Sequence, residues 1–305
     1  MILSKPVMPL FFLLFLGISW GLYFSMLKIA VLSGISYYGI AALTTLGVAL
    51  GMSAIAVARR KPPRLSAIHL RFYLICALLG YLLPMLCELL VIRSLPAGAL
   101  ALIVSLTPIA TLIVARLMKT DVVNRSRIAG ILLGAFAIFG VLLPEVHSQL
   151  DLSWFWLMVA VLIPLFYALY HNYIARYWPN DSDTYQVACG EAVMAFIAIA
   201  TVAFWQWQPT DVAEWNSGHN AMLFMAVISL ADIYIYFELI RLRGPIFTSH
   251  ANYIMVISGV FWGFVIFNET ITHLMWVSVS LLLVSLFLVS RQSSATGLSV
   301  PSAGS

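Results

Sequence analysis

Two carboxylates lie well inside apolar stretches of this sequence, where ionisable side chains are costly and therefore usually functional. Glu88 follows Tyr81 by seven residues, and Asp232 lies between Ser229 and Tyr236, which are also seven residues apart. On a helix these spacings place each set on one face, and a shift of 148 residues carries the first set onto the second. We therefore predict a shared cavity in which either carboxylate could pair with a cation or carry a coupling proton. The alternative is a structural hydrogen bond between helices.

Two aromatic faces are related by nearly the same shift. Trp20 and Tyr23 correspond to Tyr167 and Tyr170, and His171 follows directly. Cations are attracted to the faces of aromatic rings. We predict that these five residues line the cavity, with helix packing or an interfacial aromatic belt as the alternative.

Three further groups of ionisable residues lie in apolar stretches. His250 and Tyr253 share a helical face and are predicted to line the same cavity, although a lone histidine more often serves packing. Glu191 lies near the start of its stretch, which favours an interfacial carboxylate that reaches towards water. Glu238 lies three residues before Arg241, which favours a structural ion pair.

The elements that must position these side chains are ten apolar stretches, each near the roughly 20 residues that a membrane-spanning helix needs. The chain has 305 residues, of which 62% are hydrophobic and 9% charged, and little of it is left for a soluble domain. Three scattered cysteines predict neither a disulfide framework nor a metal site. The predicted spans are 8–30, 34–57, 69–92, 97–118, 125–144, 152–174, 185–205, 220–242, 245–267 and 271–290.

The positive charges predict how the spans are oriented. Lysines and arginines concentrate in alternate connections, and cytoplasmic loops of membrane proteins carry such an excess. If the N-terminus is cytoplasmic, only Lys28 and Arg93 of the 16 basic residues fall outside the cytoplasmic segments. We therefore expect a multi-pass protein of the inner or cytoplasmic membrane with both termini in the cytoplasm. Residues 292–305, which are rich in serine and alanine, are expected to form a disordered cytoplasmic tail.

The shared offset of 147 or 148 residues equals five spans and predicts an internal repeat. Five is odd, so the halves must lie in the membrane upside down relative to each other, as in many secondary transporters. The predicted fold is an all-α integral membrane protein with ten transmembrane helices in two inverted five-helix repeats. The first repeat is expected at 1–148 and the second at 149–291.

Several short motifs recur in an order that is typical of one family. They are Trp20-Gly21, Thr107-Pro108, the glycines at 130, 134 and 140, and Asn268-Glu269. With these motifs the chain resembles the drug/metabolite transporter superfamily in its ten-helix EamA-type branch, over about residues 8–290. Thr120-Asp121 stands where the family usually has Gly-Glu, and Val256 stands where a proline is expected. The resemblance implies export of amino acids, other metabolites or drugs.

The predicted function is secondary active export of a small cationic or zwitterionic amine, amino-acid-like or a drug, by alternating access with proton coupling as an option. Aromatic walls and carboxylates suit such a cargo, and no basic residue lies firmly inside a span, which disfavours strongly anionic cargo. No cofactor, metal or nucleic acid is expected, and the predicted partners are the bilayer and the small-molecule substrate. The oligomeric state is left open.

Other functions are possible from the residues alone. A passive facilitator or channel needs the same polar path as an exporter. An intramembrane hydrolase would use Ser19, within Gly17-Ile18-Ser19-Trp20-Gly21, or Ser258 as nucleophile and His171 or His250 as base. The Gly-x-Ser-x-Gly motif needs a strand–turn–helix context, whereas here it lies in an apolar helix, so we predict that the protein is not an enzyme.

Overall fold

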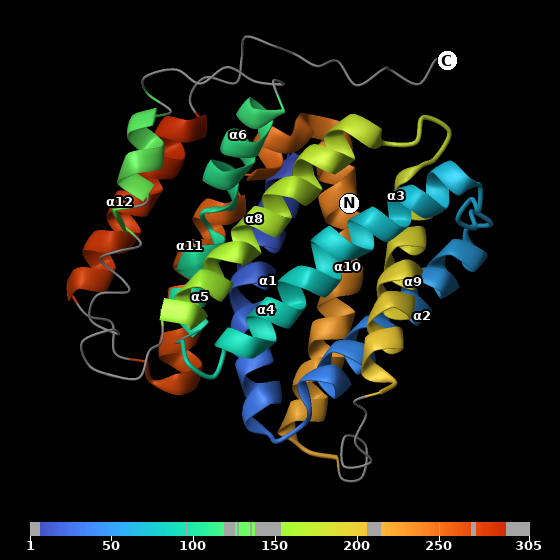
Figure 1. Ribbon diagram of the computed structural model, residues 1–305, viewed down its shortest axis with the longest axis horizontal. Coiled ribbons are helices and arrows are strands. Elements are labelled where there is room, and N and C mark those ends of the chain that lie inside the picture. The colour runs from blue at the N-terminus through green and yellow to red at the C-terminus, as the bar shows by residue number, and fades with distance from the viewer. Residues whose placement is uncertain are drawn as a thin grey trace.

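The computed structural model describes residues 7–95, 97–118, 126, 128–134, 136–137, 154–205, 215–249, 251–269 and 273–290. All regular structure in these residues is helical, and Figure 1 shows the helices side by side in one bundle. The helices are α1 (Val7–Leu32), α2 (Tyr37–Ala58), α3 (Ala67–Ala77), η1 (Leu78–Leu82), α4 (Leu83–Val91), α5 (Ala97–Val104), α6 (Thr107–Leu117), α8 (Trp154–Tyr177), α9 (Thr184–Ala203), α10 (Ser217–Ser249), α11 (Ala251–Phe267) and α12 (His273–Ser290).

The apolar stretches coincide with helices. Seven helical segments within the described residues are long and apolar enough to cross a membrane, and α11 and α12 contain shorter apolar segments. Helical backbone at 126–137, where it is described, accounts for the remaining predicted span. The prediction of a multi-pass, all-helical membrane protein is confirmed. The expected tail at 292–305 and the boundary between repeats at 148–149 lie outside the described residues.

One predicted boundary is wrong. We expected a break at residues 243–244, but helical backbone continues through Gly244 and Pro245 to Ser249. The apolar part of α10 nevertheless ends at Ile240, so the helix extends beyond its membrane-spanning segment. Proline removes one backbone donor without preventing helical dihedral angles, which is why composition placed the end too early.

Prolines affect two of the membrane segments locally. Pro84 lacks the N–H that would bond to the carbonyl of Gly80, and the turn before it, η1, is a π-helix. Pro108 lies at the start of α6, after the turn at Ser105 and Leu106 that separates α6 from α5. Pro164, by contrast, lies inside α8 without ending it. The third predicted span therefore changes from α-helical to π-helical hydrogen bonding at Leu78–Leu82, where it meets the cavity described below.

Left-handed residues end two helices. Arg60 has φ 54°, and the amides of Arg60 and Lys61 bond back to Val57 and Ala56, which is a Schellman ending of α2. Asn268 has φ 51° and its amide bonds to Phe264 at the end of α11. Asparagine tolerates this conformation better than most residues. These two turns direct the side chains that follow, Lys61 and Glu269, towards other helices.

The packing partners of the two halves correspond. α1 packs on α10 and α11, and its counterpart α8 packs on α4 and α6. α2 packs on its own counterpart α9, and α5 packs on α11. In Figure 1, α2 and α9 lie at one edge of the bundle and α12 at the opposite edge. Each of these helix contacts therefore corresponds to an equivalent contact when the helices of one half are replaced by their counterparts in the other half. The inverted orientation of the two repeats stays a prediction.

Glycines allow the closest helix contacts. A Cβ at Gly21 would lie 2.6 Å from the backbone nitrogen of Gly259, so α1 and α11 approach each other at this point. Gly47 and Gly51, which are spaced for close helix contact, face Ala226 and Leu230 of α10. This small-residue face is therefore used within the chain.

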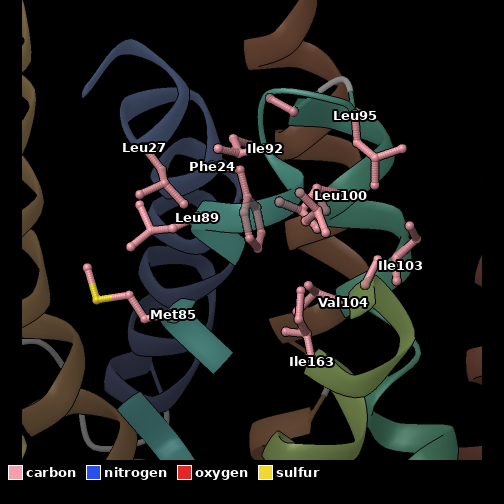
Figure 2. Close-up of a cluster of buried hydrophobic side chains, with 14 of the residues drawn as sticks. Phe24, Leu27, Met85, Leu89, Ile92, Leu95, Leu100, Ile103, Val104 and Ile163 are labelled. Atoms are coloured by element: carbon pink, nitrogen blue, oxygen red, sulfur yellow. The ribbon is translucent and has the colours of Figure 1, made fainter. Parts of the chain in front are cut away.

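Apolar side chains fill the space between α1, α4, α5 and α8. Figure 2 shows Phe24 and Leu27 of α1 near Leu89 and Ile92, with Leu100 and Ile163 completing the cluster. Leu27, Leu89, Ile92, Leu100 and Ile163 are fully buried. This cluster holds one end of the bundle together beside the cavity.

Candidate functional site

A cavity of about 190 Å³ lies among the helices of the bundle, well above the ~10–15 Å³ that a cavity needs to hold one water. Its wall comes from α1, α2, η1, α4, α5, α6, α8, α10 and α11, so both halves of the chain contribute. The lining residues are Trp20, Tyr23, Phe24, Thr44, Thr45, Val48, Gly80, Tyr81, Met85, Glu88, Val104, Thr107, Tyr167, Tyr170, His171, Ser229, Asp232, Ile233, Tyr236, Asn252 and Met255.

Glu88 is the more deeply buried of the two lining carboxylates, with 1% of its surface exposed. The hydroxyl of Tyr167 donates a hydrogen bond of 3.0 Å to Glu88 Oε1, and Tyr23 is a second hydroxyl that interacts with this carboxylate. Glu88 Oε2 has no hydrogen-bond partner among the described residues. A buried carboxylate oxygen without a donor is costly. Glu88 can therefore accept hydrogen bonds from a molecule that enters the cavity.

Asp232 lines the cavity from the second half of the chain, on α10. Ser19 Oγ of α1 lies 2.6 Å from Asp232 Oδ1. Ser19 itself is only 4% exposed and does not line the cavity. The two carboxylates thus come from equivalent helices of the two halves, but they have different partners.

Aromatic rings surround Tyr236 at the centre of the wall. The rings of Tyr170 and Tyr236 are stacked with centroids 6.2 Å apart, and His171 lies tilted at 5.8 Å from Tyr236. Trp20 approaches Tyr236 from α1 at 6.1 Å. These faces can attract a cation. No lysine or arginine is among the described residues that line the cavity.

The structure brings ten of the twelve predicted site residues to this cavity wall. The exceptions are Tyr253, which packs against the apolar core instead, and His250, which lies outside the described residues. Tyr253 shares a predicted face with His250, but the face of α11 that reaches the cavity carries Asn252 and Met255. An uncertainty of one residue in helix register is enough to explain this difference.

Sequence reasoning missed the hydroxyls and the amide of the wall. Thr44 and Thr45 of α2, Thr107 of α6 and Asn252 of α11 all line the cavity. Thr44 Oγ1 is buried and has no hydrogen-bond partner among the described residues. The adjacent threonines Thr44 and Thr45, in the middle of an otherwise apolar stretch, could have indicated a polar position on that helix. Threonine is nevertheless common in membrane helices, where it can bond to its own backbone.

Glu191 differs from the sequence interpretation. It was expected at the membrane interface, but it is completely buried, and the hydroxyl of Tyr170 donates a 3.0 Å hydrogen bond to its Oε2. Glu191 thus lies directly behind the cavity wall. Glu238 is also buried and accepts a 3.1 Å hydrogen bond from Thr184. The side chain of Arg241, its predicted partner, lies outside the described residues, so that ion pair stays a prediction.

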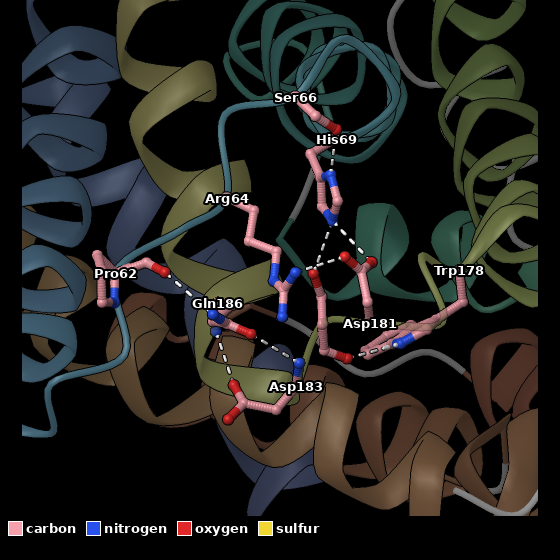
Figure 3. Close-up of polar contacts among 9 residues, drawn as sticks. Pro62, Arg64, Ser66, His69, Trp178, Asp181, Asp183 and Gln186 are labelled. Atoms are coloured by element: carbon pink, nitrogen blue, oxygen red, sulfur yellow. Dashed lines mark hydrogen bonds and ion pairs between the residues drawn. The ribbon is translucent and has the colours of Figure 1, made fainter.

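Ion pairs connect the two halves near the starts of α3 and α9, and Figure 3 shows those that Arg64 and His69 make with Asp181. Asp181 Oδ2 accepts from Arg64 Nη1 at 2.7 Å, and His69 Nε2 lies 3.1 Å from Asp181 Oδ1. Lys61 contacts Asp183 at 2.5 Å, and Asp183 also caps α9 by accepting from the amide of Gln186. Burial alone would raise the pKa of Asp183, but the hydrogen bonds from Lys61 and from the start of α9 hold it below its usual value.

A further ion pair joins α1 to the segment after α11. Lys28 Nζ lies 2.8 Å from Glu269 Oε1, and the amide of Ala97 at the start of α5 donates to the same oxygen at 3.1 Å. The Lys28 ammonium also lies 4.7 Å from the centre of the Phe267 ring. Glu269 therefore joins α1, α5 and α11. This explains why a left-handed Asn268 precedes it.

Among the described residues of the hydrolase alternative, Ser19 and Ser258 bond to groups other than His171, and His250 lies outside the described residues. The described partners of Ser19 are Leu16 and Asp232, and Ser258 donates to the carbonyl of Ile18 at 3.1 Å. His171 Nδ1 lies 3.5 Å from Thr111 Oγ1. No group of three or more potential metal ligands occurs in the part of the chain that the structure describes.

Comparisons with known proteins agree with this architecture. A solved structure described only as "Crystal structure of protein" superposes with a TM-score of 0.65 at 14% identity, covering 91% of this chain and 98% of that chain. That identity establishes similarity of fold alone. No curated protein matches the chain. The EamA-like transporter family matches twice in succession, at residues 7–143 and 154–291. The chain therefore belongs to the EamA-like transporter family.

Proposed function

We propose that this protein is a secondary active transporter that exports a small cationic or zwitterionic amine by alternating access, coupled to protons. In this proposal the two family matches are inverted five-helix repeats in the inner membrane, with both termini in the cytoplasm. The positive charges of the alternate connections and the exchangeable packing of the two halves support this arrangement.

One observation carries the choice of cargo. Glu88 Oε2 is buried and without a donor at the wall of a cavity that aromatic rings line and that no described lysine or arginine neutralises. An ammonium group would supply the missing donor and the missing positive charge together. A carboxylate or phosphate cargo would face repulsion from Glu88 and Asp232. The supported cargo is therefore an amine, with room for a small organic skeleton against the aromatic rings.

The matched pair of variants Glu88→Gln and Glu191→Gln tests this proposal. Both remove a buried carboxylate charge, but only Glu88 lines the cavity. Media from cells that express wild type, each variant or an empty vector are compared by untargeted mass spectrometry. We expect an amine-bearing compound to accumulate with wild type and with Glu191→Gln, and to be reduced with Glu88→Gln. A compound without an amine that accumulates equally with both variants would contradict the proposal.

The passive facilitator is separated from the transporter by a concentration measurement. The compound found in the medium is loaded into proteoliposomes that contain the purified chain, at equal concentration on both sides. An imposed proton gradient should drive its net movement if transport is coupled. A facilitator would leave the two concentrations equal.

A further inference from the structure

Ser19 has one hydroxyl hydrogen and two acceptors within reach. Its Oγ lies 3.0 Å from the carbonyl oxygen of Leu16 and 2.6 Å from Asp232 Oδ1. The bond to the carbonyl three residues earlier is a common arrangement in this chain, since Ser33 and Ser105 make the same bond. A single hydrogen cannot make two well-aligned hydrogen bonds at once.

The protonation state of Asp232 resolves this conflict in two different ways. When Asp232 holds a proton on Oδ1, it donates to Ser19 Oγ, and Ser19 donates to the carbonyl of Leu16, so both contacts are made. When Asp232 is ionised, the Ser19 hydrogen turns to Oδ1, and a separation of 2.6 Å is typical of such a charge-assisted bond. Ser19 can therefore support either state without a movement of the helix backbone.

Glu88 has no comparable arrangement. Tyr167 donates to Glu88 Oε1 and the Tyr23 hydroxyl also interacts with this carboxylate, but Glu88 Oε2 has no hydrogen-bond partner among the described residues and can accept from a molecule in the cavity. The two carboxylates, which are equivalent in the two halves, are thus prepared for different ligands.

We propose that Asp232 carries the coupling proton, with Ser19 as its positioning residue, while Glu88 binds the amine. This assignment rests on the proposed function. It also gives a role to Ser19 that the Gly-x-Ser-x-Gly pattern did not reveal. When the amine enters, the O–H bond of Asp232 breaks, the proton leaves to water in the cavity, and the Ser19 hydrogen turns from Leu16 to the new carboxylate. Protonation from the other side of the membrane reverses these steps.

Other titratable groups line the same cavity as Asp232 or lie directly behind its wall, and the experiment must distinguish them. Tyr236 lies on α10 itself, and the other helices add carboxyl, phenol and imidazole groups but no described lysine or arginine at the cavity wall. These groups are Tyr23 from α1, Tyr81 from η1, Glu88 from α4, Tyr170 and His171 from α8, and Glu191 from α9, whereas α2 contributes the threonines 44 and 45.

The protonation of Asp232 can be measured without any cargo. Infrared difference spectra of the purified full chain in lipid, recorded as pH changes, report the carbonyl stretch of each protonated carboxylic acid. We expect one such band to disappear in Asp232→Asn and to change in frequency and pH midpoint in Ser19→Ala. Ser25→Ala is the matched control, because Ser25 is also a buried serine of α1 but does not contact Asp232. A spectrum that is the same in wild type, Asp232→Asn and Ser19→Ala would overturn the assignment.

The coupling role is measured with phenethylammonium as the probe amine in proteoliposomes. In wild type we expect a proton gradient to accelerate probe movement severalfold, in Asp232→Asn any probe movement to show no response to the gradient, and in Glu88→Gln probe movement to be lost. Ser19→Ala should shift the pH dependence of probe movement. Gradient-driven movement that persists in Asp232→Asn would overturn the assignment but leave the proposed function intact. If wild type moves no probe, the proposed function loses support, and the infrared result alone decides whether Asp232 and Ser19 form the proton site.

Discussion

The contact between α1 and α11 predicts a large cost for the smallest change at Gly21. A Cβ there would lie 2.6 Å from Gly259 N and 2.6 Å from Ser258 Oγ, closer than real Cβ contacts come. One of these neighbours is backbone, so the strain cannot be relieved by rotation of a side chain. Gly21→Ala must separate the two helices.

The magnitude follows from two contributions. Overpacking of a well-packed interior costs about 1–3 kcal/mol, and contact with backbone favours the upper part of that range. Ser258 Oγ must also move, which weakens its 3.1 Å bond to the carbonyl of Ile18 and costs about 1 kcal/mol. We expect Gly21→Ala to lower the free energy of unfolding by about 2–4 kcal/mol on these grounds.

The assay is equilibrium unfolding of the purified chain in mixed micelles, with increasing dodecyl sulfate and tryptophan fluorescence as the signal. Ile18→Ala is the control, because Ile18 lies on the same helix and is 47% exposed on the outside of the bundle. It should change the unfolding free energy much less than Gly21→Ala. If Gly21→Ala unfolds at the same dodecyl sulfate concentration as wild type, the close contact of α1 and α11 is refuted.

Three further predictions concern charges. Glu88→Gln removes one partner of a buried charge pair and should weaken amine binding by about 2–5 kcal/mol, measured by calorimetric titration; unchanged affinity would contradict it. Asp183→Ala removes the cap of α9 and the carboxylate partner of Lys61, and it should lower the free energy of unfolding by about 0.5–2 kcal/mol. Because the pKa of Asp183 is lowered in the folded chain, the carboxylate stabilises the fold above its unfolded pKa, and this stabilisation is lost as pH falls through the folded pKa. The unfolding curves of wild type and variant should therefore converge in acid. Lys28→Met leaves the partly buried Glu269 without its cation and should destabilise the chain, whereas the double variant with Glu269→Gln should recover part of the loss.

Much of the cavity could be predicted because helical spacing alone defines a face. Tyr81, Glu88 and Asp232 all lie on the cavity wall, and the interval of seven residues that recurs in both halves is what allowed them to be assigned to shared faces. The interpretation of Glu191 was wrong because its environment depends on Tyr170 from another helix. Distance along a helix gives no information about such a neighbour.

The polar details of the site depend on tertiary contacts in the same way. Ser19 gains its importance from a residue 213 positions away, and the π-helical turn before Pro84 brings Gly80 against the Tyr170 ring. Neither relation has a period in the sequence. The family resemblance, which rests on short local motifs, was confirmed by the EamA-like family matches at residues 7–143 and 154–291.

The absence of a described lysine or arginine from the cavity wall has an electrical consequence. With a singly charged amine cation on Glu88 and Asp232 ionised, the wall and its cargo together carry one negative charge. With Glu88 empty and Asp232 protonated, they again carry one negative charge. Moving a charge through a membrane potential of 100 mV changes its energy by about 2.3 kcal/mol, but equal charge in both directions cancels this work over a cycle. The exchange of one amine cation for one proton should therefore respond to the pH difference across the membrane and be indifferent to its voltage, whereas exchange of a zwitterion for one proton should respond to both.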